Sequence, residues 1–282
     1  MTLISISIQS KGGPGSGNWG HRGIPGKVGG SSPRGAGYLT IKRAGTPGVG
    51  GYDKTAANVL YEVTKDVGGW QYVSDVHKGA IKSNIVDDIS RQAGVGKYTV
   101  NDMLKQWATT SNDEDMQSLS MQEAVSEEFG VPLSDWQKDK IDTVGVNLSD
   151  VRRNHERSVV RAMYNSTQKS LTDAGYKPGD TVTLYRGMNV SDAKHKVGDI
   201  VNYKGNAIES WSIDSRSASD FAAGWTSESG VQGLIISMQV PIENIISTAA
   251  TGFGCMDEAE FVILGSILGN IANVTKASTE RS

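Results

Sequence analysis

Apolar residues recur every three or four positions from about Asp53 to Tyr176. This spacing puts them on one face of a helix, so the region is predicted to be helical. Five apolar faces can be traced: Ala56, Val59, Leu60, Val63 and Val67; Ile81, Ile85 and Ile89; Val100, Met103, Leu104 and Trp107; Met116, Leu119, Val125 and Phe129; and Val160, Met163 or Tyr164, Thr167 and Leu171.

Capping residues mark the ends of several of these predicted helices. Asp53 and Thr99 stand where a side-chain oxygen would cap the first and the third helix. The last helix is predicted to begin at Ser149 or Asp150 and to stop at residues 175–179, which include two glycines and a proline.

After the last helix the pattern changes to short apolar runs that are typical of strands. Helices followed by strands predict an α+β fold, with a helical lobe over residues 52–176 and a β core over residues 177–282. The predicted strands of the core are 181–185, 199–203, 231–240, 260–265 and 271–275.

Residues 11–51 differ in composition from the rest of the chain. They hold 15 of the 34 glycines and 4 of the 7 prolines. Ordering so many glycines costs backbone entropy, and the segment has little apolar surface to offset that cost. We therefore predict a flexible N-terminal arm over residues 1–51. Only its start, where Ile4, Ile6 and Ile8 alternate with serines, has the pattern of a strand.

The composition argues against several classes of protein. A net charge of −3 does not suit a general nucleic-acid or membrane-surface binder, and without a run of 18 apolar residues no membrane span is predicted. Cys255, the single cysteine, cannot form an internal disulfide. The four histidines do not fall at ligand spacing with Cys255 or with one another, so no metal site is predicted.

Three polar motifs in the second half of the chain each lie beside an apolar run. They are Arg186 in LYRGM, the pair Ser210 and Ser212 in ESWSIDS, and the pair Glu258 and Glu260 in MDEAEFVILG. Residues two apart on a strand point to the same face, so the two glutamates would look into one cleft. A pair of either type alone is usually solvated surface, but the ordered combination points to chemistry.

In this order the motifs resemble those of the mono-ADP-ribosyltransferases, in particular the arginine-modifying branch found in binary bacterial toxins and bacteriophages. The resemblance runs from about residue 52 to the end, and it implies a helical lobe, two packed sheets and NAD as co-substrate. It also implies that nicotinamide is released and that ADP-ribose is transferred to an arginine of a target protein. That target is expected to be a bacterial host protein in the host cytoplasm.

The chemistry of that reaction explains the residue types. Cleavage between nicotinamide and ribose leaves a sugar cation, which a carboxylate about 4 Å away stabilises by roughly 4 kcal/mol at an effective dielectric constant near 20. The resemblance assigns this role to Glu260, held in place by Ser210, and assigns the acceptor arginine to Glu258. Arg186 would bind the diphosphate through paired hydrogen bonds.

The resemblance gives roles to four further residues. Gly187 and Phe221 would contact the nicotinamide. Ser212 would bind NAD, and Phe253 would recognise the acceptor. The sequence departs from the family at Trp211, where Thr is usual, and in the loop after Phe221, which contains no Arg or Lys to bind a phosphate.

The missing phosphate contact could come from the last predicted helix, which borders the NAD cleft in the family. Arg157 and Arg161 are four residues apart and share a face, and Tyr164 follows them closely. The alternative is that these arginines form a solvated basic face, as such runs usually do.

Two other functions stay open at this point. A NAD glycohydrolase would use the same cleft with water as acceptor, although Glu258 and Phe253 favour a protein acceptor. A structural or interaction protein of a phage particle is the other, because the Gly-rich arm resembles a segment of tailed-phage head-associated proteins. Through that arm the enzyme itself could associate with the virion and be delivered with the phage particle.

Overall fold

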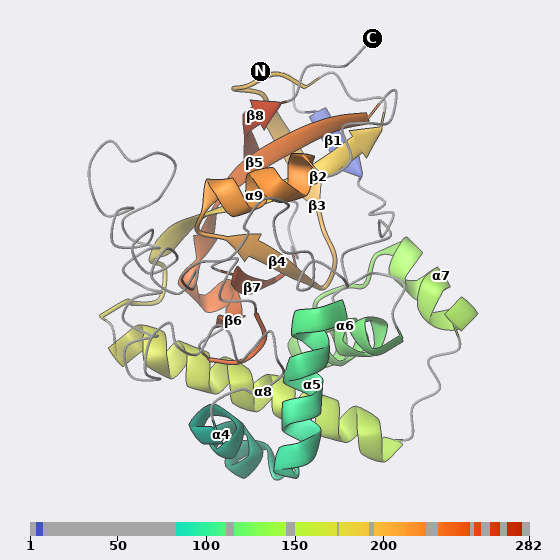
Figure 1. Cartoon of the computed structure of the whole chain (residues 1–282), viewed down its shortest axis with the longest axis vertical. Helices are drawn as coiled ribbons and strands as arrows, with labels where there is room; N and C mark the ends of the chain where they lie inside the picture. Colours follow the sequence, from blue (N-terminus) through green and yellow to red (C-terminus); the bar gives the residue numbers. More distant parts are fainter. Residues whose placement is uncertain are drawn as a thin grey trace, which may run out of the picture.

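The computed structural model describes ten segments of the chain: residues 4–7, 83–110, 116–144, 150–173, 175–191, 195–223, 231–248, 251–254, 260–265 and 270–277. Over these segments the protein is a mixed α+β fold, as predicted. Figure 1 shows the helices α4 to α8 gathered at one end of the molecule and most of the strands at the other.

The helical lobe is built around its longest helix. α8 (Asp150–Asp173) contacts both α4 (Ser83–Ala93) and α6 (Met116–Phe129). α5 (Lys97–Thr110) joins α4 to α6, and α7 (Asp135–Val144) packs on α6. The inward face of α8 follows the predicted stripe, because Val160, Met163, Thr167 and Leu171 are all fully buried. The fifth helix of the sequence pattern is thus confirmed in position and in orientation.

Two details of the helical prediction are wrong. α5 begins at Lys97, so Thr99 lies inside the helix and does not cap it. α7 was missed, although its start carries a recognisable signal. Ser134 Oγ accepts from the backbone N–H of Gln137, and Gln137 Oε1 accepts from the backbone N–H of Ser134. This reciprocal pair is a capping box. The helix predicted to begin at Asp53 falls outside the described residues.

The strands follow the predicted runs closely, with two additions. β2 (Thr181–Ser191), β3 (Ile200–Lys204), β5 (Val231–Pro241), β7 (Glu260–Leu264) and β8 (Asn270–Ala277) confirm the five predicted strands. β4 (Ile208–Ser212), β6 (Ile245–Thr248) and the helix α9 (Ser215–Ala223) were not predicted.

The described strands lie in the order β1-β3-β8-β5-β2-β4-β7-β6. All neighbours are antiparallel except β1 (Ile4–Ser7), which pairs with β3 in parallel. The strand predicted at the start of the sequence is therefore present. It adds four residues of the region assigned to the N-terminal arm to the edge of the sheet, while residues 8–82 lie outside the described segments.

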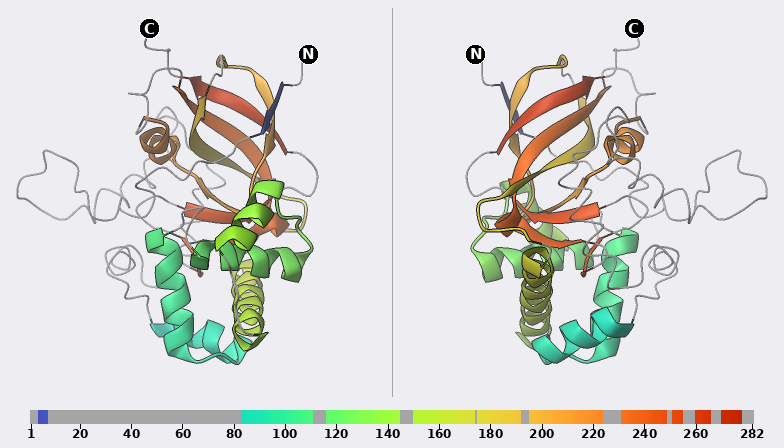
Figure 2. Two further views of the ribbon diagram at one scale, coloured as in Figure 1. Left: turned by 90° about the vertical axis from the view of Figure 1, so that its right-hand side faces the viewer. Right: turned by 90° about the vertical axis from the view of Figure 1, so that its left-hand side faces the viewer.

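The sheet has one weak junction. β2 and β5 pair over the whole of both strands, whereas β2 and β4 share a single registered pair, Tyr185 with Ser212. Among the described residues no further pair joins these two strands, so this junction divides the one sheet into a larger part (β1-β3-β8-β5-β2) and a smaller part (β4-β7-β6). The smaller part lies next to the helical lobe, where β6 contacts α8 (Figure 2). Arg186, the pair Ser210 and Ser212, and Glu260 lie on the neighbouring strands β2, β4 and β7 at and beside this junction.

Candidate active site

Arg186 lies at the junction between the two parts of the sheet. Its Nη1 donates to the backbone oxygen of Ser210 at 2.6 Å. In the described part of the chain β2 and β4 share only one registered pair, so no backbone N–H of β2 is paired with this Ser210 carbonyl. The guanidinium of Arg186 supplies the hydrogen bond instead. The Arg186 side chain is 23% exposed. It is therefore held between the strands with part of its surface open to a ligand.

A buried carboxylate stands on the other side of the guanidinium. Glu209 Oε1 lies 4.0 Å from Arg186 Nη2. The same oxygen accepts from Tyr203 Oη at 2.6 Å and from the backbone N–H of Asn206 at 3.0 Å. The turn between β3 and β4 closes tightly on this group, since a Cβ at Gly205 would lie within 2.4 Å of the carboxylate atoms.

Trp211, which stands between the two serines, belongs to this buried group. Its Nε1 donates to Glu209 Oε2 at 3.3 Å, and its ring packs edge-on against Tyr203 at 5.7 Å. Residues alternate in direction along a strand, so Trp211 points to the face opposite Ser210 and Ser212. The Trp211 side chain therefore contacts Glu209 and does not interfere with the two serines on the other face.

Glu260 stands directly opposite Ser212. The two residues are partners in the antiparallel pairing of β4 with β7, in which Ser210 faces Val262. The geometry thus brings Ser212, more than Ser210, next to Glu260. Ser212 Oγ accepts from the backbone N–H of Asp214 at 2.8 Å, which fixes the turn into α9.

Glu260 is only 4% exposed and is covered by a residue of the helical lobe. Trp107 Nε1, on α5, donates to Glu260 Oε1 at 3.3 Å. The indole also stacks on Phe253, with ring centroids 5.0 Å apart and planes 12° from parallel. Any ligand that touches this carboxylate from the side of α5 must first displace Trp107.

Phe253 is fully buried by the same contacts. Its backbone N–H donates to Met163 Sδ at 3.1 Å, and its carbonyl accepts from Ser247 Oγ at 2.8 Å. A residue that recognises an acceptor from solution needs an exposed ring, and here Phe253 instead joins the helical lobe to the sheet.

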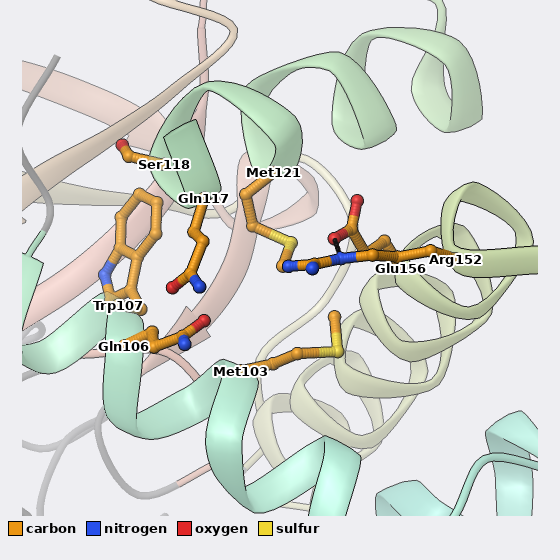
Figure 3. A pocket seen from close by; sticks show the side chains of 8 residues that line it. All are labelled: Met103, Gln106, Trp107, Gln117, Ser118, Met121, Arg152 and Glu156. Atoms are coloured by element: carbon orange, nitrogen blue, oxygen red, sulfur yellow. Dashed lines mark hydrogen bonds and ion pairs between the residues drawn. The ribbon is translucent and has the colours of Figure 1, made fainter. Parts of the chain in front are cut away.

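Trp107 also borders a small cavity between α5, α6 and α8. Figure 3 shows the indole at one end and the ion pair of Arg152 and Glu156 at the other. The cavity measures about 10 Å³, which is close to the space that one water molecule needs. It is far too small for a nucleotide, so it does not serve as a ligand site.

The two key side chains leave the sheet on different faces. Ser212 and Glu260 share one face by their register, while Arg186 contacts Glu209 on the other face of β4. A single ligand can reach both only where β2 and β4 separate. The junction of the sheet is therefore the part of the described structure at which a diphosphate and a sugar could be bound together.

Gly187 and Phe221 lie on the α9 side of the junction. A Cβ at Gly187 would lie 1.7 Å from the carbonyl oxygen of Ala218, so only glycine permits this approach of α9 to β2. Phe221 is 39% exposed, and its carbonyl accepts from Asn189 Nδ2 at 3.3 Å. An exposed aromatic ring of this kind can stack on a flat heterocycle.

Arg157 and Arg161 bind a carboxylate of the helical lobe. The carboxylate of Glu128 on α6 forms ion pairs with Arg157 Nε at 3.1 Å and with Arg161 Nε at 2.7 Å. The guanidinium of Arg161 also lies over the ring of Phe129. They line an open groove of about 600 Å³ between α4, α6 and α8. Arg161 is roughly 200° around the helix from Met163, so this groove faces away from Phe253 and the junction.

Tyr164 links α8 to the sheet. Its hydroxyl donates to the backbone oxygen of Glu243 at 3.1 Å. Burial raises the pKa of its phenol, against a lowering by Arg161, so the group remains a protonated donor at neutral pH. Its described contacts are structural ones.

Glu258 and Cys255 lie outside the described residues, so the acceptor position predicted for Glu258 stays a prediction. Among the segments that the structure describes, no group of three or more His, Cys, Asp or Glu side chains is arranged to hold a metal ion. In the same segments no helix is both long and apolar enough to cross a membrane.

Two functional candidates were missed at the level of sequence. Glu209 directly precedes Ser210 in the Ser-x-Ser motif. Because neighbouring residues of a strand point to opposite faces, the sequence could have assigned Glu209 to the face opposite the two serines. The sequence gives no such signal for Trp107. A tryptophan on the apolar face of a helix is expected to be buried, and its hydrogen-bond partner Glu260 is 153 residues away.

Comparison with known proteins leaves the site to be interpreted from its own geometry. No protein-family model matches the chain, and neither the curated proteins nor the solved structures yield a match.

Proposed function

We propose that the protein is an arginine-specific mono-ADP-ribosyltransferase that uses NAD as co-substrate. One observation carries the proposal: the three motifs lie on adjacent strands, with Arg186 bonded to the backbone of Ser210 and Ser212 opposite Glu260. These residues are far apart in sequence, and nothing in the hydrophobic pattern requires them to meet. Arg186 and Glu260 leave opposite faces of the sheet, and a ligand bound at the junction of β2 and β4 could reach both.

In this proposal NAD lies across the junction between β2 and β4. Arg186 binds the diphosphate, and the larger and smaller parts of the sheet correspond to the two packed sheets of the transferase family. Phe221 stacks on the nicotinamide ring, and the backbone of Gly187 contacts its amide. Ser212 stands beside Glu260 on the ribose side.

The bond between the nicotinamide nitrogen and the ribose carbon breaks, and nicotinamide leaves with the electron pair. The negative charge of Glu260 stabilises the sugar cation that remains. This attraction is strongest where water is excluded from the site. A guanidine nitrogen of the acceptor then attacks the anomeric carbon and loses a proton. Glu258 holds that guanidine by a charge-assisted hydrogen bond.

The position of Trp107 implies a conformational step. Because the indole bonds to Glu260 and covers it on the side of α5, a ribose that comes from that side can reach the carboxylate only after Trp107 moves. We therefore take the described structure as the closed form of the enzyme.

NAD glycohydrolase is the second candidate, and the burial of Phe253 favours it. Without an exposed aromatic for the acceptor, water would take the place of arginine at the anomeric carbon.

As the protein acceptor we propose a bacterial host protein in the host cytoplasm, with delivery by the phage particle through the Gly-rich arm. Both points rest on sequence resemblance.

One experiment tests these alternatives together. Wild-type protein and Glu260→Gln are incubated with NAD labelled in its adenylate phosphate and with a bacterial lysate, and labelled protein and free ADP-ribose are measured. Label on protein, removable with hydroxylamine as expected for an arginine linkage, supports the transferase. Free ADP-ribose alone supports the glycohydrolase. Equal signals from the wild type and Glu260→Gln would overturn both.

A further inference from the structure

Glu209 is a buried carboxylate that the structure places against Arg186. We infer that Glu209 is a positioning residue, which fixes the guanidinium of Arg186 in the orientation that binds a diphosphate. The inference rests on the proposed function and extends it to a residue outside the motifs. It is drawn from the contacts of Glu209 and from the place of Arg186 between two diverging strands.

The carboxylate of Glu209 is itself rigidly held. Three donors from different parts of the chain converge on it: the Tyr203 hydroxyl from β3, the backbone N–H of Asn206 from the turn, and the Trp211 indole from β4. Its side chain is 3% exposed. A group with this many fixed donors has one orientation, so it can serve as a reference for its neighbours.

Arg186 is held from two sides as a result. The Ser210 carbonyl accepts from Nη1, and Glu209 attracts Nη2 from 4.0 Å. A guanidinium is planar, so two fixed neighbours define the plane of the whole group. A diphosphate needs that plane set in advance, because paired hydrogen bonds to its oxygens depend on direction.

The effect of Glu209 on a bound anion has two opposing parts. As a negative charge it weakens the attraction of Arg186 for a diphosphate, and as an anchor it strengthens the paired hydrogen bonds. Three donors already compensate the charge of Glu209, so its repulsion of a ligand is reduced. The anchoring effect should be the larger of the two, so loss of the Glu209 charge is expected to weaken the binding of NAD.

The test is a double-mutant cycle between Glu209→Gln and Arg186→Lys. Gln keeps the size of the side chain and removes its charge. Glu209→Gln should raise the KM for NAD about tenfold in the wild-type background and change kcat by less than about threefold. In the Arg186→Lys background the same change should have no further effect, because the fork that Glu209 orients is gone. A fall in KM, or effects that multiply, would overturn the inference.

Denaturant unfolding of the same four proteins gives a readout that does not depend on NAD. If Glu209 holds Arg186, the double variant loses less stability than the two single variants together. Additive losses would overturn the contact itself. If the wild type neither cleaves nor binds NAD, the proposed function fails, and this unfolding cycle alone decides whether Glu209 fixes Arg186.

Tyr203→Phe serves as the second variant in case Glu209→Gln does not fold. It leaves the charge of Glu209 and removes only the hydroxyl that donates to it. A rise of about two- to threefold in the KM for NAD, with kcat kept, supports the anchoring. A KM equal to that of the wild type in a folded Tyr203→Phe protein would overturn it.

Discussion

Two of the Arg–Glu clusters among the described residues differ clearly in burial. In the sheet cluster, Arg186 is 23% exposed and faces Glu209, which is 3% exposed. In the helix cluster, Arg157 and Arg161 are 40% and 44% exposed and share Glu128. The sequence drew attention to arginines in both regions, and it could not tell which of them has a fixed partner.

The difference in burial decides what each cluster can do. Exposed ion pairs are worth little and are screened by salt, so the pairs of the helix cluster are expected to add little to stability. A buried pair is costly to form unless its remaining atoms are satisfied, and it is then rigid. The sheet cluster meets that condition through Tyr203 and Trp211. We therefore expect chemistry from the sheet cluster and adaptable surface contacts from the helix cluster.

The largest expected effect belongs to Glu260, which shares the junction with the sheet cluster. Glu260→Gln should lower both ADP-ribose transfer and NAD hydrolysis by about a hundred- to a thousandfold, as when one preorganised electrostatic group is removed. Glu258→Gln should abolish transfer to arginine and leave NAD hydrolysis measurable, because only the acceptor loses its attraction. Both activities are measured on one preparation of each variant.

Equal loss of the two activities in both variants would contradict this division of labour. Full transfer by Glu258→Gln would show that this acid does not touch the acceptor. Glu243→Gln is a suitable control, because Glu243 is exposed and its side chain contacts only a loop amide among the described residues.

The next effect concerns the fork of Arg186. Arg186→Lys keeps the charge and loses the planar pair of donors, so NAD binding should weaken by about 1.5–3 kcal/mol, roughly ten- to a hundredfold in KM. Steady-state kinetics with NAD as the varied substrate checks this. Lys196→Arg, at an exposed turn, controls for the exchange itself. If KM and kcat are unchanged, Arg186 does not bind NAD, and the two clusters do not differ in function.

A moderate effect of opposite sign is expected for Trp107. Trp107→Phe keeps a ring to stack on Phe253 and loses the N–H that bonds to Glu260. If the indole must leave before the ribose arrives, kcat/KM for NAD should rise by up to about tenfold, the scale of one hydrogen bond to a charged group. Thermal unfolding shows whether the fold is kept. A fall in kcat in a folded variant would instead mean that Trp107 holds Glu260 during the reaction.

The smallest effect belongs to the helix cluster. Arg157→Ala and Arg161→Ala should each change the KM for NAD by less than about twofold and lower stability by about 0.2–1 kcal/mol, a loss that shrinks at high salt. Lys169→Ala, which breaks an exposed pair with Asp173 on the same helix, is the matched control. If one of the two arginine variants raises KM several-fold, that arginine reaches NAD and the groove is part of the site.

The sequence predicted the helices and strands whose apolar residues follow a clear period. α8 is an example, because its buried stripe of Val160, Met163, Thr167 and Leu171 could be read directly. β4 was missed since its letters, IESWS, mix polar and apolar residues that are buried on both faces. Burial of Glu209 and Ser212 depends on partners elsewhere in the chain, and a local pattern contains no information about them.

For the site, the sequence supplied the residue types and the structure supplied their neighbours. The motif order placed Arg186, Ser210 and Glu260 in one region, and the sheet brings their strands together. The register that puts Ser212 opposite Glu260 could not be derived, because it is set by strand pairing over 48 residues of chain. Burial of Phe253 under Trp107 was equally out of reach, since the helical lobe provides it.

The order of the strands has a consequence for folding. Among the described ladders only the one between β6 and β7 joins strands that follow each other in the chain. β2 must wait for β5, β4 for β7 and β3 for β8, so the sheet cannot grow hairpin by hairpin during synthesis. Non-local pairing of this kind slows folding and leaves apolar strand edges exposed in the meantime. A recombinant chain that ends before β8 would lack the partner of both β3 and β5, and it is the form most prone to aggregate.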